Sequence, residues 1–166
     1  MSSLADAAAQ ADAFAEEGNE RELSQLRAQW DDDLEAAART SDFRLRAVAY
    51  RAIGQFRFRT KRELLRRGLE DESPACRGSA LVSLELLSRD GPAPVNQSRG
   101  LLHEMASGDD NEAVRRLAIV CLKNGSPQRE TIVLLGGLAE SDEESRELKE
   151  TARKVAAQLT KKSRAR

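Results

Sequence analysis

The sequence of 166 residues has the length of one ordinary domain and carries a formal net charge of −1, with 40% hydrophobic, 33% charged and 4% aromatic residues. Its high content of Ala, Leu, Glu and Arg favours helix over sheet. No stretch approaches the roughly 20 apolar residues of a membrane span, and the N-terminus lacks a basic segment followed by an apolar run. We therefore expect a cytoplasmic protein with no membrane partner.

The first forty residues predict a helical hairpin. Apolar residues recur at helical spacing in residues 4–14 and again in 23–37, and Gly18-Asn19 interrupts the pattern between them. We assign residues 1–40 to a degenerate N-terminal hairpin that caps the rest of the fold.

Positive charge is concentrated in the next segment. Residues 43–67 hold nine Arg or Lys against one Glu, a charge of +8, whereas residues 1–42 carry −8 and residues 68–166 carry −1. Within this segment, Gly54 is predicted to end one helix and Thr60 to cap another, so that QFRFR forms the turn between them.

The helix predicted after this turn has two distinct faces. Spacing of 100° per residue puts its leucines on one side and its arginines on the opposite, solvent-facing side. The leucines are Leu64, Leu65 and Leu69, and the arginines are Arg62, Arg66 and Arg67.

A short pattern recurs four times along the chain, at intervals of 31, 38 and 34 residues. Each copy consists of a cation, a small residue three positions later and an apolar residue four positions after that. Second segments with leucines at helical spacing lie between the copies, so each repeat is predicted to be a helical hairpin. The copies are Arg46, Ala49 and Ile53; Arg77, Ala80 and Leu84; Arg115, Ala118 and Leu122; and Lys149, Ala152 and Ala156.

Capping chemistry marks the predicted helix starts. Three pairs match the capping box, and two Ser-Pro pairs match a cap followed by proline at the first helical position. The capping boxes are Thr60 with Glu63, Asp109 with Glu112 and Ser141 with Glu144, and the Ser-Pro pairs are Ser73-Pro74 and Ser126-Pro127. Residues 160–166 are predicted to form a basic disordered tail.

The repeats resemble HEAT-like (PBS-lyase-type) helical repeats of the short bacterial kind. That pattern places an Asp early in the first helix, then Arg, a small residue and Ile or Leu, and its best matches here begin at Asp42 and Asp110. The resemblance covers residues 42 to about 158. It implies an all-α, right-handed α-solenoid of helical hairpins, which we expect to hold about nine helices and to place the repeats in residues 41–159.

The resemblance also implies how the repeats are joined. In HEAT-like repeats the Asp and Arg side chains tie one repeat to the next through buried or half-buried polar contacts. That role falls here to Asp42, Arg46, Arg77, Asp110 and Arg115. The family includes adaptors, phycobilin lyase partners and DNA glycosylases, so the resemblance alone does not choose among these functions.

Catalytic patterns are weak. His103 is a lone histidine on a leucine-rich segment, and Trp30 lies beside three aspartates in a part of the chain that the repeats do not frame. Cys76 and Cys121 lie in apolar helical patterns, which predicts buried, reduced thiols. The acidic connectors are placed where they would cap helices. We expect no enzyme activity, no catalytic residue, no cofactor and no metal.

Three interpretations of the basic segment remain open. In the first, its cations form a solvated face that the acidic N-terminal hairpin neutralises. In the second, they bind an acidic protein surface. In the third, they bind nucleic acid, and Phe56 and Phe58 stack on bases. We predict a non-catalytic protein-binding adaptor or scaffold that uses a basic concave face to bind an acidic protein partner. The alternative is a nucleic-acid-binding module related to HEAT-like DNA glycosylases. The predicted partner-binding residues are Arg57, Arg59, Lys61, Arg62, Arg66 and Arg67.

Overall fold

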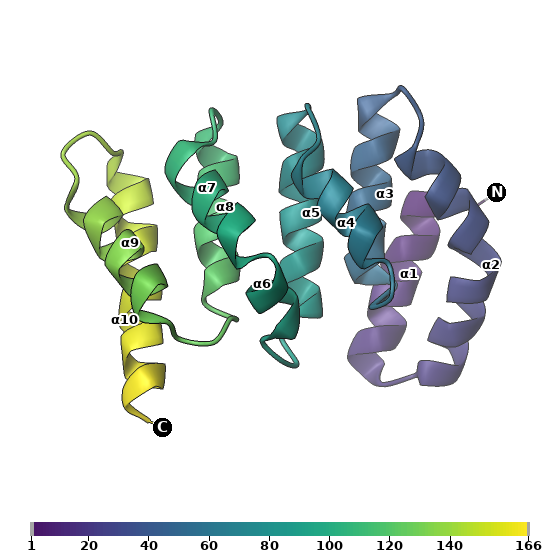
Figure 1. Ribbon diagram of the computed structural model, residues 1–166. Helices are drawn as coiled ribbons and strands as arrows, with labels where there is room; N and C mark the ends of the chain where they lie inside the picture. Colours follow the sequence, from purple (N-terminus) through teal and green to yellow (C-terminus); the bar gives the residue numbers. More distant parts are fainter. Residues whose placement is uncertain (1, 166) are drawn as a thin grey trace. The chain divides into compact units, whose positions relative to one another are not determined.

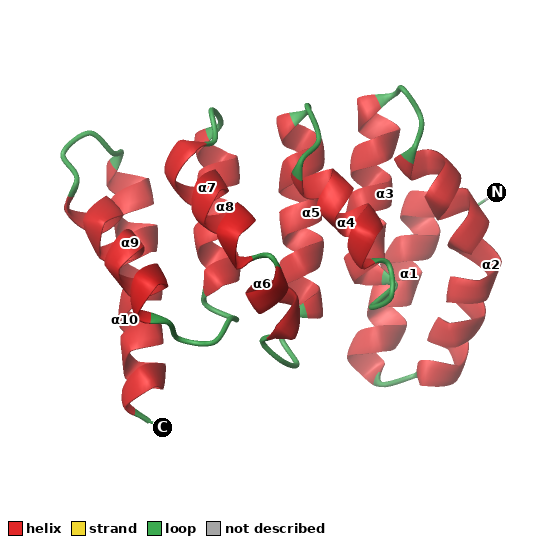
Figure 2. Ribbon diagram, in the orientation of Figure 1, coloured by secondary structure: helices red, strands yellow, loops and turns green. Residues whose placement is uncertain are grey.

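The computed structural model describes residues 2–165, in which helices joined by loops and turns are the only regular secondary structure (Figures 1 and 2). The all-α prediction is thus confirmed. The chain divides into two compact units at Leu87 and Ser88. None of the described helices is both long enough and apolar enough to cross a membrane. The first unit holds α1 (Leu4–Glu17), α2 (Glu20–Ala38), α3 (Phe43–Gln55), α4 (Arg62–Leu69) and α5 (Pro74–Leu87), and the second holds α6 (Ala93–Gln97), α7 (Arg99–Gly108), α8 (Glu112–Leu122), α9 (Arg129–Glu140) and α10 (Arg146–Arg164).

In the first unit, α3 is the central helix. It packs against α1, α2, α4 and most extensively α5, and α4 packs mainly against α5 (Figure 1). The helices α1, α3 and α5 form one layer, and α2 and α4 pack onto it. This two-layer packing is compatible with the α-solenoid that the repeats predict, whereas its right-handed winding stays a prediction.

The close approach of α3 and α5 depends on a glycine and a serine. Ser83 Oγ, on α5, accepts a hydrogen bond of 2.8 Å from the Gly54 N–H and donates to the Tyr50 carbonyl, both on α3. Gly54 allows this contact because a Cβ at its position would lie 2.6 Å from Ser83 Cα. Ser83 is fully buried, and its hydroxyl therefore satisfies backbone groups inside the packed layer.

Local signals fix the ends of the N-terminal hairpin. Ser3 and Asp6 form a capping box at the start of α1, and Asn19 accepts a hydrogen bond from Glu22 N–H at the start of α2. Gly18 adopts a φ of 74°, a left-handed conformation that glycine enters without a steric penalty. The predicted break at Gly18-Asn19 is confirmed.

In the second unit, α7 packs against α8 and α9 packs against α10, while α8 and α10 lie in contact. The described residues contain ten helices in place of the nine predicted. The additional helix, α6, is a short one that follows Gly91-Pro92. Val95 is completely buried and holds α6 against the unit.

The repeat pattern marks core positions, as expected for a helical repeat. All the small residues and all the apolar residues of the first three copies are buried, whereas Ala156 of the fourth copy is half-buried. The buried residues are Ala49, Ile53, Ala80, Leu84, Ala118, Leu122 and Ala152. Local periodicity therefore located most of the interior correctly.

Two groups of sequence predictions are wrong in detail. Thr60, Asp109 and Ser141 are not the N-caps, because the helices begin later, after Lys61, Asn111 and Ser145. Residues 160–164, predicted as disordered, continue α10. Their helix is anchored by the fully buried Leu159 and by Lys162 Nζ, which donates to the Lys123 and Gly125 carbonyls. Arg166 lies outside the described residues.

Candidate interaction surface

The turn between α3 and α4, residues 56–61, is built on two buried rings. Phe56 is completely buried and Phe58 is 8% exposed, and their ring centroids lie 5.5 Å apart. Since both rings pack inward, they cannot stack on the bases of a nucleic acid. We call residues 56–61 the basic turn. Its cations lie outside the two packed rings, which anchor the turn.

Arg57 of the basic turn contacts α1. Its Nη1 lies 2.9 Å from Asp12 Oδ1 and its Nη2 lies 3.2 Å from Glu16 Oε1. Nη1 also donates to the Gly54 carbonyl at 2.8 Å. Arg57 has a φ of 58°, which is uncommon for a non-glycine residue, so these contacts stabilise a backbone conformation that the residue alone disfavours.

Lys61 makes the equivalent contact with α2. Its Nζ lies 2.6 Å from Asp31 Oδ1 and 3.1 Å from Glu35 Oε1, and 4.8 Å from the centroid of the Phe58 ring. Burial by itself would lower the pKa of Lys61, but the hydrogen bonds and charges of Asp31 and Glu35 raise it above its ordinary value. The lysine is therefore held charged between two carboxylates.

A third contact joins the acidic hairpin, α1–α2, to the basic turn. Arg27 Nη1, on α2, donates to the Phe56 carbonyl at 3.0 Å. Together these contacts match the neutralisation that the opposite charges of residues 1–42 and 43–67 suggested. Two of the six predicted binding residues, Arg57 and Lys61, are thus engaged within the chain.

The other four predicted binding residues are exposed. Arg59 Nη1 donates to the Leu87 carbonyl at 3.0 Å, and Arg66 Nε lies 3.0 Å from Glu70 Oε1 on the same helix. Arg62 and Arg67 lie on α4, and a shallow depression is lined by Arg66, Arg67, Glu63 and Glu70. Four of the six residues are therefore exposed, and two of them, Arg66 and Arg67, share this depression with two acids.

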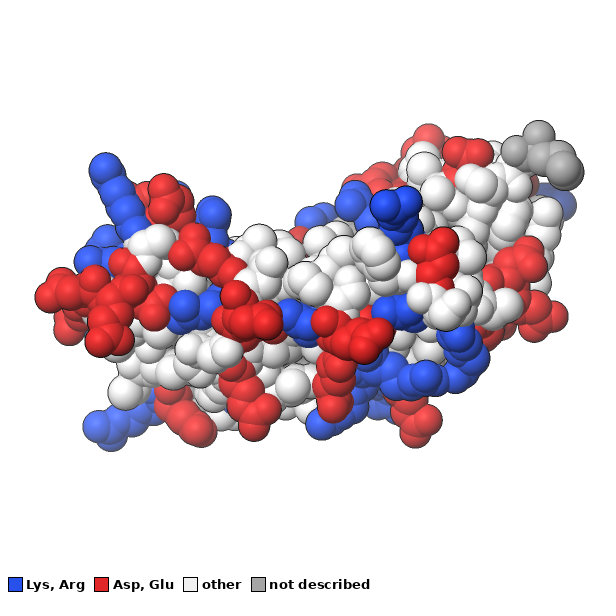
Figure 3. All heavy atoms as spheres, turned by 90° about the horizontal axis from the view of Figure 1, so that it is seen from above, with Lys and Arg blue, Asp and Glu red and all other residues white. Residues whose placement is uncertain are grey.

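Acidic and basic side chains are interspersed on the molecular face seen in Figure 3. The charge segregation read along the sequence is therefore stronger than the segregation on this face. Ion pairs such as those of Arg57 with Asp12 and of Arg66 with Glu70 bring acids beside the cations of residues 43–67.

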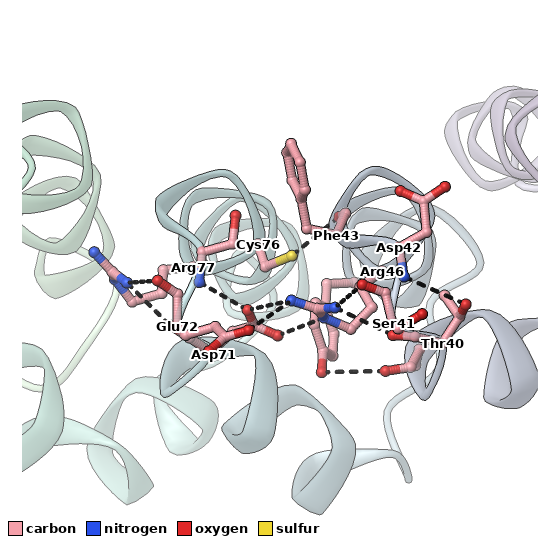
Figure 4. Close-up of polar contacts among 12 residues, drawn as sticks. Thr40, Ser41, Asp42, Phe43, Arg46, Asp71, Glu72, Cys76 and Arg77 are labelled. Carbon is pink, nitrogen blue, oxygen red and sulfur yellow. Dashed lines mark hydrogen bonds and ion pairs between the residues drawn. The ribbon is translucent and has the colours of Figure 1, made fainter.

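A second polar cluster joins consecutive repeats in the first unit (Figure 4). Arg46 on α3 bonds Asp71 through Nε at 2.9 Å and Nη2 at 3.0 Å, and its Nη1 donates to the Thr40 and Ser41 carbonyls. Arg77 donates to the Asp71 and Glu72 carbonyls. Each arginine thus binds the connector that precedes its helix, and Arg46 also binds the following one.

Electrostatics keep this cluster charged. Burial alone would raise the pKa of Asp71, but the hydrogen bonds and charge of Arg46, with a hydrogen bond from Ser73 N–H, lower it below its usual range. The hydrogen bonds between Arg46 and Asp71 also raise the pKa of Arg46. A paired carboxylate and guanidinium of this kind hold the repeats together.

The remaining residues of the predicted ties differ in role. Arg115 Nε donates to the Ala106 carbonyl of α7 at 2.9 Å, and Arg115 Nη1 lies 2.7 Å from Glu144 Oε2, so Arg115 joins α7 to the connector that precedes α10. Asp42 instead caps α3 by accepting from Arg44 N–H, and the acid that pairs with Arg46 is Asp71. The role of the exposed Asp110 stays a prediction.

His103 and the two cysteines occupy structural positions. His103 Nε2 lies 2.9 Å from Thr131 Oγ1, which also accepts a hydrogen bond of 2.8 Å from the buried Arg99. Cys76 and Cys121 are buried free thiols, and Cys76 donates to the Phe43 carbonyl. Within residues 2–165, no group of three or more His, Cys, Asp or Glu is placed to hold a metal ion.

Sequence reasoning missed the network of Arg99, Thr131 and His103. Burial lowers the pKa of both Arg99 and His103, and Arg99 also donates to Asn96 Oδ1 and to the Ser126 carbonyl. The available signal was an arginine at the start of a leucine-rich segment.

Comparison with protein-family models, curated proteins and solved structures finds no match to this chain.

Proposed function

We propose that this chain is a HEAT-like repeat protein that acts as a non-catalytic adaptor or scaffold and binds an acidic protein partner through the arginine face of α4. This face consists of Arg62, Arg66 and Arg67, all of which are exposed. The observation that carries the proposal is the difference in exposure along α4, whose arginines are exposed whereas its leucines are only 1–6% exposed. The helix thus offers its cations to solvent while its apolar face holds it in place.

Exposed arginines suit recognition of carboxylates. A guanidinium presents several N–H donors in a planar fork, so it binds a carboxylate in a defined geometry. Exposed cations also accelerate encounter with an acidic surface and act less on the lifetime of the complex. Nucleic acid is less favoured as a ligand, because Phe56 and Phe58 are buried and cannot supply base stacking.

The test is charge reversal at Arg62 and Arg66. Binding of a fluorescein-labelled helical peptide, with glutamates four residues apart among alanines, is measured by stopped flow at several salt concentrations. We expect the Arg62→Glu, Arg66→Glu variant to associate at least about tenfold more slowly and to lose most of the salt dependence. The matched control reverses Lys154 and Lys161, which are also exposed but lie on α10.

Thermal melts of both variants complete the experiment. Exposed charges away from buried networks contribute within about 0.5 kcal/mol, so both variants should melt close to the wild type. If the control slows association as much as the α4 variant, net charge and not the arginine face governs binding. Salt-sensitive, micromolar binding of duplex DNA without peptide binding would replace the proposal with the nucleic-acid alternative.

A further inference from the structure

The acidic hairpin meets the basic turn with pairs of carboxylates. Asp12 and Glu16 of α1 hold Arg57, and Asp31 and Glu35 of α2 hold Lys61. In both pairs the two acids are four positions apart, so one helix turn separates them and both face the same cation. Each half of the hairpin therefore presents the same recognition element: a helix with carboxylates at i and i+4.

The acids and the cations differ in exposure. The side chains of Arg57 and Lys61 are only 15% and 11% exposed, whereas those of Glu16 and Asp31 are 65% and 49% exposed. Ion pairs with such exposed carboxylates contribute little to stability, because water and salt compete for them. These carboxylates can therefore be exchanged for those of another molecule.

The hairpin has a separate anchor that does not depend on these ion pairs. Ala8, Ala11, Leu23 and Leu34 are at most 2% exposed, and α1 and α2 both pack against α3. Apolar burial of this kind dominates the free energy that holds a helix in place. Release of the carboxylates would consequently leave the hairpin docked and the basic turn accessible.

We infer that the acidic hairpin is an internal competitor for the partner site, and that the partner it mimics is an acidic helix with carboxylates four residues apart. The inference rests on the proposed function, because it extends the arginine face of α4 to Arg57 and Lys61. The partner's carboxylates exchange with those of the hairpin at these two cations. The intact hairpin thereby lowers the affinity of the chain for acidic helices.

The test neutralises the four contacting acids with isosteric amides and measures the Kd of the glutamate–alanine helical peptide by fluorescence anisotropy. The matched control neutralises four acids of the same hairpin for which no contact with the basic turn is seen, so its net charge is identical. The competitor variant is Asp12→Asn, Glu16→Gln, Asp31→Asn and Glu35→Gln. The control variant is Glu17→Gln, Glu22→Gln, Asp32→Asn and Asp33→Asn.

We expect the competitor variant to bind the peptide at least about fivefold more tightly than the control, the gain that two released ion pairs of ordinary strength produce. Equal affinity of the two variants would overturn the inference while leaving the proposed function intact, provided that reversal of Arg62 and Arg66 still weakens wild-type binding. Absence of binding by every variant would overturn both.

Two further variants cover a failure to fold. The half-neutralised variants, Asp12→Asn with Glu16→Gln and Asp31→Asn with Glu35→Gln, each release one cation and retain the other contact. Each should bind the peptide about twofold more tightly than a control with two neutral substitutions at Asp32 and Asp33. A gain no larger than that of this control would refute the competitor role.

Discussion

Replacing Gly54 with alanine is expected to destabilise the first unit. A Cβ at this position would lie 2.6 Å from Ser83 Cα, 2.8 Å from Ser83 Oγ and 3.0 Å from Ser83 Cβ. Carbon atoms pack best about 3.5–4.0 Å apart, so α3 and α5 would have to separate by about 1 Å. The nearest atom belongs to the backbone, and a change of rotamer cannot relieve the contact.

Three contributions set the size of this effect. Overpacking of a filled interior costs about 1–3 kcal/mol. Separation also stretches the 2.8 Å bond from Gly54 N–H to Ser83 Oγ, and a buried polar group without its partner costs about 1–3 kcal/mol. The better helix propensity of alanine returns up to about 1 kcal/mol. The net expected loss is about 2–4 kcal/mol in the free energy of unfolding.

Urea denaturation followed by circular dichroism measures this loss. Gly100→Ala on α7 is the matched control, because no heavy atom lies within 4 Å of a Cβ built there. Alanine should stabilise that position by up to about 1 kcal/mol. If Gly54→Ala proves as stable as the wild type, the close contact of α3 with α5 at Ser83 is refuted.

Two further substitutions test the second unit. Ala118→Leu places a larger side chain at a completely buried position and should cost about 1–3 kcal/mol in a thermal melt, and an unchanged melt would count against the repeat alignment. Burial lowers the pKa of His103 despite the opposing charge of Glu130, and Arg99 lowers it further. As the pH falls, His103 is therefore protonated in the unfolded state before it is protonated in the folded state. Stability should therefore fall as pH drops below about 6.5 towards the folded pKa. In urea denaturation the His103→Gln variant should lose this dependence, and a pH profile identical to that of the wild type would refute the role of His103.

The sequence by itself determined the helices and most of the interior. The spacing of Ala49 and Ile53, repeated at Ala80 and Leu84, is a local property that puts these residues on one helix face, and burial of that face follows wherever the helix packs. The arginines and leucines of α4 likewise lie within eight successive positions. These features need no knowledge of which helices become neighbours.

Local competition explains the smaller errors. Several polar residues stand before each helix, and each of them can cap it; the choice of Asn111 over Asp109, or Ser145 over Ser141, depends on where the chain leaves the preceding helix. The final turns of α10 depend on the distant Lys123 and Gly125 carbonyls, which Lys162 reaches. Neither the charge nor the spacing of residues in the sequence predicts the hydrogen bonds of Lys162 with these carbonyls.

Only the tertiary structure decided which cations remain exposed. Arg57 and Asp12 are 45 positions apart, and Lys61 and Asp31 are 30 positions apart. The opposite net charges of residues 1–42 and 43–67 are compatible with such ion pairs. Which residues pair depends on how α1 and α2 are aligned along α3. That alignment is fixed by packing of buried alanines and leucines, and it leaves Arg62, Arg66 and Arg67 exposed while Arg57 and Lys61 meet the hairpin.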